Sequence, residues 1–140
     1  MKKILILSNG EQIGDGILKL VLIYQLRNRF PEHEIHWATD KNKTVYDTIL
    51  KSFVLDYIDV IWSQSNLSPF FWNKISDKYD FQNYEFDIII DTQKAISRTI
   101  ALKRIKSKNF ISATANWIFS DARPEKKTIK HPFYVRNTIQ

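Results

Sequence analysis

The chain has 140 residues, a length typical of one domain, and 44% of them are hydrophobic, which is enough to build a buried core. It contains no cysteine. This excludes disulfides, a thiol nucleophile and thiolate metal sites, and it suits a reducing compartment. No uncharged apolar run approaches the roughly 20 residues that span a bilayer, and the opening run MKKILIL ends too early for a secretory signal. We therefore expect a soluble, cytoplasmic protein.

The net charge of +6 is concentrated at the end of the chain. Residues 123–140 hold five basic residues and one acidic residue: Arg123, Lys126, Lys127, Lys130 and Arg136 against Glu125. This tail lacks the interleaving of aromatic and basic residues that single-strand binders use, so no nucleic-acid partner is expected. A solvated tail and a contact with an anionic partner both remain open. We divide the chain into a domain at residues 1–122 and a basic tail at 123–140.

Apolar runs alternate with helical spacing along the first half of the chain. Lys3–Ser8 is a short β-branched run that predicts a strand buried on both faces. Asp15–Phe30 has helical spacing with cations late in the segment, where they suit the helix dipole, and a proline follows it. Glu34–Thr39 predicts a second strand, Thr44–Phe53 a helix and Tyr57–Trp62 a third strand.

The second half is less regular at first. Ser68-Pro69 is typical of an N-cap followed by proline in the first helical position, which predicts a helix through Ser76 or Tyr79. Further segments are then a clear strand, a helix, a short strand, and a strand or extended loop: Phe86–Asp91, Ala95–Ile105, Asn109–Ser112 and Ala115–Phe119. This alternation predicts a single α/β, Rossmann-like domain with a mainly parallel sheet and helices on both faces.

All three glycines of the chain lie between the first strand and the first helix, as Gly10, Gly14 and Gly16. Ligands of open α/β sheets bind beyond the carboxyl ends of the strands, where this loop lies. The spacing of the glycines matches neither the dinucleotide fingerprint nor a Walker loop. Asp15, in their midst, has two interpretations. It is either an N-cap worth about 1 kcal/mol or a base held at a cleft, ionised beside the helix dipole.

Other polar residues share that edge of the predicted sheet. Asp91 ends a strand and is followed by Gln93, and it is either a turn residue or part of a site. Asp40 ends the second strand near the spacing at which a dinucleotide domain places its ribose-binding acid. His33 and His36 are three apart in an extended segment and make poor joint metal ligands, so no metal site is predicted. The aromatic residues Phe70, Phe71 and Trp72 are interpreted as core or interface.

Three segments resemble a known family. KILILSNGEQIGDGILKLVLIYQLRNRFPEHEIHWAT resembles the amino-terminal half of the ADP-heptose:lipopolysaccharide heptosyltransferases, the family 9 glycosyltransferases. The similar features are a buried first strand, a loop ending in Gly14-Asp15, and a helix that ends at Arg27–Pro31. FDIIIDTQKAISRT is similar to the family's Asp-x-Gln-Gly segment, and FSDARPEK resembles a stretch with Ala-Arg before an acid.

The resemblance implies the amino-terminal half of a GT-B glycosyltransferase, in which two Rossmann-like domains face each other across a cleft. It implies that Asp15 is the general base of an inverting transfer, without a cofactor. Gly14, Gly16, Asp91 and Gln93 would bind the acceptor, and Arg123 would meet an anionic group on it. The implied acceptor is a glycolipid or similar anionic glycan, and the implied location is cytoplasmic, peripheral to the inner membrane.

The sequence departs from the family in its motifs and in its length. Asn9–Gln12 stand where members have basic and hydroxyl residues, Lys94 replaces a glycine, and Ser97-Arg98 reverses a basic-hydroxyl order. These changes point to a different acceptor. In the family the nucleotide-sugar sits mainly on the carboxyl-terminal domain, which these residues do not include. We therefore expect a truncated or split product that is inactive alone, complemented by a donor-binding polypeptide.

Two other functions remain open from the sequence. One is a small nucleotide- or dinucleotide-binding module that uses Gly10–Gly16 and Asp40. The other is a non-catalytic interaction domain that self-associates or needs a partner.

Overall fold

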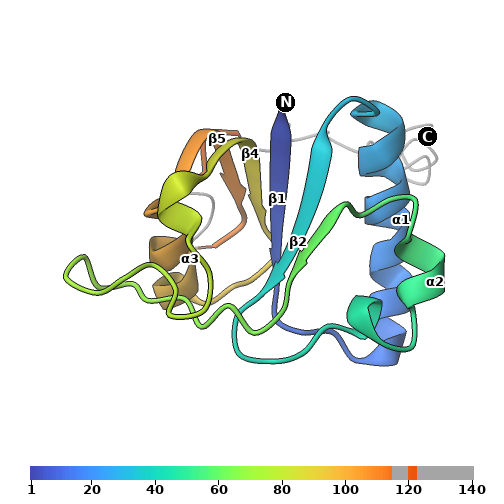
Figure 1. Cartoon of the computed structure of the whole chain (residues 1–140), viewed down its shortest axis with the longest axis horizontal. Helices are drawn as coiled ribbons and strands as arrows, with labels where there is room; N and C mark the ends of the chain where they lie inside the picture. Colours follow the sequence, from blue (N-terminus) through green and yellow to red (C-terminus); the bar gives the residue numbers. More distant parts are fainter. Residues whose placement is uncertain (115–119, 123–140) are drawn as a thin grey trace, which may run out of the picture.

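The computed structural model describes residues 1–114 and 120–122. Five strands form one sheet in the order β3-β2-β1-β4-β5, and every neighbouring pair is parallel. In Figure 1, α1 and α2 lie to one side of the sheet and α3 to the other. The elements are β1 Lys3–Ser8, α1 Ile13–Arg29, β2 Glu34–Thr39, η1 Val45–Asp47, α2 Lys51–Val54, β3 Val60–Trp62, η2 Phe81–Asn83, β4 Glu85–Asp91, α3 Ile96–Lys103 and β5 Lys106–Ser112. The predicted α/β, Rossmann-like class is confirmed.

The central strand β1 divides two hydrophobic cores. Its residues 4–7 are fully buried, and successive side chains point to opposite faces because strands alternate. Ile4 and Ile6 pack with Ile23 of α1 and Trp37 of β2. The intervening leucines of β1 pack on the other face with α3, β5 and the segment before β4; this second core comprises Leu5, Leu7, Ala38, Leu67, Ile75, Phe81, Phe86, Ile89, Ala101, Leu102, Ile105 and Phe110. Among the described residues, no helix is long and apolar enough to cross a membrane.

The prediction of a single helix at Thr44–Phe53 is wrong. The segment forms two short elements, η1 and α2, with a break between them. Thr44 caps η1 by accepting a hydrogen bond from the Tyr46 amide. The break falls at Thr48, whose backbone angles (φ −132°, ψ −107°) are far from helical. The Tyr46 hydroxyl donates to the Gly16 carbonyl at 2.7 Å, so η1 is held against α1 by a contact that local sequence does not show.

The helix predicted from Ser68 to Ser76 or Tyr79 is also wrong. This segment is an irregular loop whose base is an isolated antiparallel bridge between Leu67 and Ser76. Two serine hydroxyls bind local backbone amides in place of helical bonds: Ser68 accepts from Phe70, and Ser76 accepts from residues 78 and 79. Such local bonds compete with the helix. The aromatic residues at its tip are exposed and do not belong to the core.

Strand β3 begins at Val60 rather than at Tyr57. The Asp59 carboxylate accepts a hydrogen bond from the Ile35 amide at 2.7 Å and pairs with Arg27 at 2.6 Å. The residues just before Asp59 therefore form a turn that ends α2. The segment predicted as Ala115–Phe119, and the basic tail 123–140, lie outside the described residues.

A buried histidine on β2 gives the fold a pH dependence. His36 is almost fully buried, its Nδ1 accepts a hydrogen bond from Trp62 Nε1 at 2.9 Å, and its Nε2 faces the Glu34 carboxylate. Burial lowers the pKa of His36 below its ordinary value, an effect that Glu34 only partly opposes. The neutral imidazole, with its proton on Nε2, satisfies both partners.

We expect the free energy of unfolding to fall as the pH drops below about 6.5. His36 then binds a proton in the unfolded chain, whereas in the folded protein it stays neutral because its pKa is lowered. The stability that neutral, buried His36 contributes is present in full above that pH. It is lost as the pH falls toward the pKa of His36 in the folded protein. Its slope is at most about 1.4 kcal/mol per pH unit. Urea unfolding between pH 7 and pH 5 measures it. The variant His36→Gln, which retains an acceptor and a donor, should have a flatter profile, and an equal slope would contradict this assignment.

Candidate functional site

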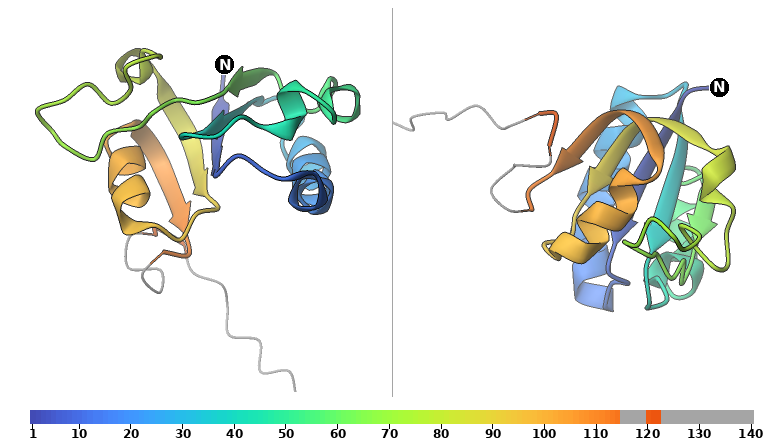
Figure 2. Two further views of the ribbon diagram at one scale, coloured as in Figure 1. Left: turned by 90° about the horizontal axis from the view of Figure 1, so that it is seen from below. Right: turned by 90° about the vertical axis from the view of Figure 1, so that its left-hand side faces the viewer.

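The candidate site lies at the carboxyl edge of the sheet, which faces the viewer in the left view of Figure 2. Here β1 and β4 are neighbours, with Leu7 opposite Asp91, and Thr92 donates two hydrogen bonds to the Leu7 carbonyl. From this edge, β1 leads to α1 on one face and β4 leads to α3 on the other. Open α/β sheets bind ligands at such a point, where the strand order reverses and the following helices lie on opposite faces. We call this edge, with the loops that follow the strands, the rim.

Two of the three glycines are required by close contacts, Gly10 in the loop between β1 and α1 and Gly16 in the first turn of α1. Gly10 has φ +80°, a left-handed conformation that side chains rarely adopt, and a Cβ there would collide with Asn42. A Cβ on Gly16 would lie 2.5 Å from Val45 Cγ2, so glycine allows η1 to pack closely on α1. Both roles are structural.

Gly14 differs from the other two. A Cβ built on it meets nothing within 4 Å, and the residue lies inside the first turn of α1. Neither packing nor backbone conformation accounts for glycine at this position. The surface next to Asp15 is therefore open for a ligand to approach the helix backbone.

Asp15 lies on the exposed side of the first turn of α1. The N-cap of this helix is Gln12, so the N-cap interpretation of Asp15 is wrong. The Asp15 side chain is 52% exposed and pairs with Lys19 at 2.7 Å. The Lys19 ammonium also donates to Ser8 Oγ at 3.0 Å. The Asp15 carboxylate is thus oriented by Lys19, which is itself bound to Ser8 at the end of β1, and it remains accessible from solvent.

Glu11 is a buried residue of the loop between β1 and α1 that the sequence analysis did not identify. Its carboxylate is 5% exposed and accepts hydrogen bonds from Trp37 Nε1 at 2.9 Å and Thr44 Oγ1 at 2.6 Å. Burial, together with the negative charges of Glu11 and Asp15, raises the pKa of Tyr46 well above its ordinary value. The Tyr46 hydroxyl therefore stays protonated and continues to donate to α1. A buried indole needs an acceptor, which was the one available signal, but the sequence does not say which residue supplies it.

Asp91 is buried and its carboxylate is used within the protein. Oδ2 accepts from the hydroxyls of Thr99 at 2.6 Å and Ser112 at 2.9 Å, and Oδ1 accepts from the Gln93 amide at 2.9 Å. The Thr114 hydroxyl donates to the Gln93 carbonyl at 2.9 Å. Asp91 therefore holds the start of α3, the end of β5 and the rim loop together. Gln93 itself is 7% exposed.

Asp40 is likewise committed to internal contacts. Its Oδ1 accepts from the Leu67 amide at 2.8 Å and its Oδ2 pairs with Arg98 of α3 at 2.6 Å. With both oxygens engaged and the side chain 3% exposed, the carboxylate is poorly placed to bind a ribose. A hollow of about 320 Å³ lies against this pair, lined also by Lys41 and Phe70.

The structure places the predicted residues on one rim but joins only some of them. Asp91 and Gln93 are directly bonded, whereas no hydrogen bond or ion pair within residues 1–114 and 120–122 links Asp15 to either of them. Arg123 lies outside the described residues. Three further lysines, Lys41, Lys43 and Lys94, are exposed in the loops that follow β2 and β4. In the part of the chain that the structure describes, no cluster of three potential ligands suits a metal ion.

Comparison of the chain with protein-family models, curated proteins and solved structures found no match.

Proposed function

We propose that this chain is the acceptor-binding half of an inverting glycosyltransferase of the heptosyltransferase type, with Asp15 as the general base. The observation that supports this best is the accessible carboxylate of Asp15, oriented by Lys19 at the rim beside the open surface of Gly14. The first segment of the family resemblance covers the same residues. A general base must lie within hydrogen-bond reach of the hydroxyl that it deprotonates, and the exposed Asp15 carboxylate is open to such a contact.

In the proposed reaction, Asp15 takes the proton from an acceptor hydroxyl while that oxygen attacks the anomeric carbon of a nucleotide-activated sugar. The new glycosidic bond forms as the bond from the anomeric carbon to the phosphate oxygen breaks, and the nucleotide leaves with the electron pair. Attack from the side opposite the leaving group inverts the configuration. A second, donor-binding polypeptide would hold the nucleotide-sugar on the other side of the cleft.

The charges at the rim support an anionic acceptor. Lys41, Lys43 and Lys94 are exposed around it, and Arg98 is partly exposed beside the hollow. Fixed cations attract a phosphorylated or carboxylated glycan and raise its local concentration. Asp91 would contribute by positioning the Gln93 loop, since its own oxygens are occupied.

A second candidate, a self-associating interaction domain, is supported by the outer face of α1. Four large aliphatic residues on this face are about half exposed or more: Ile13, Ile17, Leu18 and Val21. A helix that is apolar on all sides is normally buried. Tyr24 continues the stripe and donates to the Phe53 carbonyl, which brings the exposed Phe53 of α2 beside it. The occupant that we consider for this candidate is a second copy of the chain.

One titration tests both candidates. We expect a phosphorylated disaccharide, added to ¹⁵N-labelled protein, to shift the amide signals of Gly14, Gly16 and Gln93 saturably, whereas a nucleotide-sugar leaves them unchanged. Binding of the nucleotide-sugar alone at these amides would contradict the proposal and favour a nucleotide-binding module. Signals that respond to neither ligand, with line widths that grow with protein concentration, would favour the interaction domain instead.

A further inference from the structure

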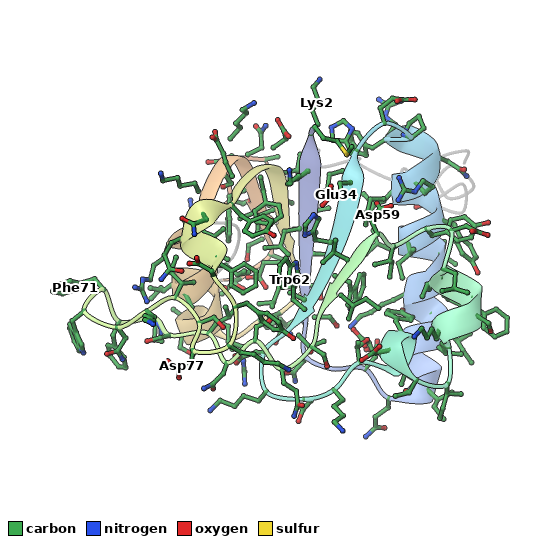
Figure 3. The ribbon with its side chains drawn as sticks, viewed as in Figure 1. Lys2, Glu34, Asp59, Trp62, Phe71 and Asp77 are labelled. Carbon is green, nitrogen blue, oxygen red and sulfur yellow. The ribbon has the colours of Figure 1, made fainter. Side chains whose placement is uncertain are left out.

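An aromatic loop projects from the body of the protein beside the rim. Residues 68–74, which we call the aromatic loop, extend beyond α3, with Phe71 labelled at the tip in Figure 3. Phe70, Phe71 and Trp72 are 50%, 84% and 68% exposed, and they contact one another through rings 4.9 to 5.0 Å apart. Single exposed apolar residues are ordinary on protein surfaces, but three consecutive ones on a projection are not.

The aromatic loop is held in place by bonds at its base. Arg104, the C-cap residue of α3, donates through one guanidinium nitrogen to the Ser68 carbonyl at 2.6 Å and through the other to the Asn73 carbonyl. The Ser68 amide donates to the Ile75 carbonyl at 2.9 Å, and Ile75 is buried in the core. The base of the aromatic loop is therefore tied to the end of α3 and to the core, while its aromatic tip stays exposed.

The loop is continuous with the rim, and the exposed charged residues in it and next to it in sequence are of both signs: Lys74 and Lys78 against Asp77 and Asp80. The segment SPFFWNK contains one lysine and no carboxylate. Phe70 lines the hollow at the rim together with Lys41 and the Asp40–Arg98 pair. The exposed Lys43 and Lys94 lie in the rim loops that follow β2 and β4. Phe70 thus connects the aromatic loop to the part of the rim that carries exposed lysines.

We propose that the aromatic loop is an anchor that inserts Phe71 and Trp72 into the interfacial region of an anionic lipid bilayer, while the lysines near it contact head groups. Tryptophan and its aromatic neighbours suit this region because their rings are apolar while the indole N–H can remain hydrated. Lysines add attraction to anionic lipids. A small convex tip fits a deformable bilayer better than a protein interface, which usually covers about 800 Å² on each partner.

The anchor would bring the rim to the surface of a membrane that holds the acceptor. The position of an acceptor rests on the proposed function, but binding to the bilayer does not. Vesicles without any glycan or nucleotide-sugar therefore test the anchor alone, and failure of the transfer reaction would leave the result unaffected.

The experiment is co-sedimentation of the full chain with vesicles of phosphatidylcholine containing 30% phosphatidylglycerol, and with phosphatidylcholine alone. We expect binding to the anionic vesicles that weakens with added salt, and at least tenfold weaker binding by Phe71→Ser/Trp72→Ser. The matched control is Ile17→Ser/Leu18→Ser, which removes two comparably exposed apolar residues from α1 and should bind as the unmodified chain does. Thermal unfolding of both variants checks that each is folded.

Fluorescence gives an independent measurement. Brominated lipids should quench the emission of the unmodified chain more than that of Trp72→Phe, because Trp72 is the indole that enters the bilayer. Absence of binding to anionic vesicles would overturn the proposal. So would equal binding by the Phe71→Ser/Trp72→Ser variant, or a loss confined to the α1 control.

Discussion

Replacement of Asp91 by alanine is expected to lower the free energy of unfolding by about 3 kcal/mol. The carboxylate is 4% exposed and accepts from two hydroxyls and one backbone amide that come from three parts of the chain. Alanine would remove the acceptor that these buried donors share, and an unsatisfied buried donor costs more than its hydrogen bond contributes. Chemical denaturation, with its midpoint and slope, measures the loss.

Two other variants make this prediction specific. Asp91→Asn retains an oxygen for the Gln93 amide, and the hydroxyls of Thr99 and Ser112 can rotate, so a smaller loss of about 1 kcal/mol is expected. Asp56→Ala removes an exposed acid and should change the stability by no more than about 0.5 kcal/mol. If Asp91→Ala were as stable as the unmodified chain, the carboxylate would not be holding the rim together.

The sheet could be predicted because its signal is local. Apolar β-branched runs such as residues 3–8 and 85–91 form strands where both faces are covered, and their parallel direction follows from the alternation with helices. The segment 68–79 could not be predicted in this way. Its conformation depends on Arg104, more than thirty residues along the chain, whose guanidinium binds carbonyls of the loop. A local N-cap pattern carries no information about that contact.

In the candidate site too, local features could be predicted and long-range contacts could not. The position of Asp15 at the start of a helix after a strand is a local feature, and it was predictable. The distinct roles of the three glycines were not, because Gly16 is required by Val45 and Gly10 by its positive φ and Asn42. Glu11 was missed since its partners, Trp37 and Thr44, lie 26 and 33 residues away. Long-range side-chain pairing is what the sequence pattern does not specify.

The outer face of α1 carries apolar residues that this domain does not bury. Ile13, Ile17, Leu18 and Val21 are exposed there, while Ile23 and Leu26 of the same helix face the core. The presence of exposed apolar residues on α1, with a separate aromatic cluster on the loop beyond α3, agrees with a domain that acts against other surfaces.

The proposed chemistry makes its largest prediction at Asp15. With a donor-binding half supplied as a separate polypeptide, Asp15→Asn should lower kcat for sugar transfer by 10²–10⁴-fold, because the amide has nearly the same shape but is not a base. The folded state should be almost unaffected. The carboxylate is about half exposed, so its ion pair with Lys19 contributes no more than about 1 kcal/mol to the free energy of unfolding.

Gly14→Ala supplies the matched comparison, one residue away on the same turn. The added methyl group meets nothing within 4 Å, and alanine favours a helix over glycine by up to about 1 kcal/mol, so this variant should be at least as stable as the unmodified chain. If the acceptor lies on this turn, the methyl group should raise KM while kcat is largely retained, whereas Asp15→Asn should lower kcat with KM little changed. This split separates a surface that binds the acceptor from a group that removes its proton. Turnover by Asp15→Asn within a few-fold of the unmodified chain would show that the carboxylate is not the base, and the accessible pair of Asp15 and Lys19 would then be a surface ion pair without a catalytic role.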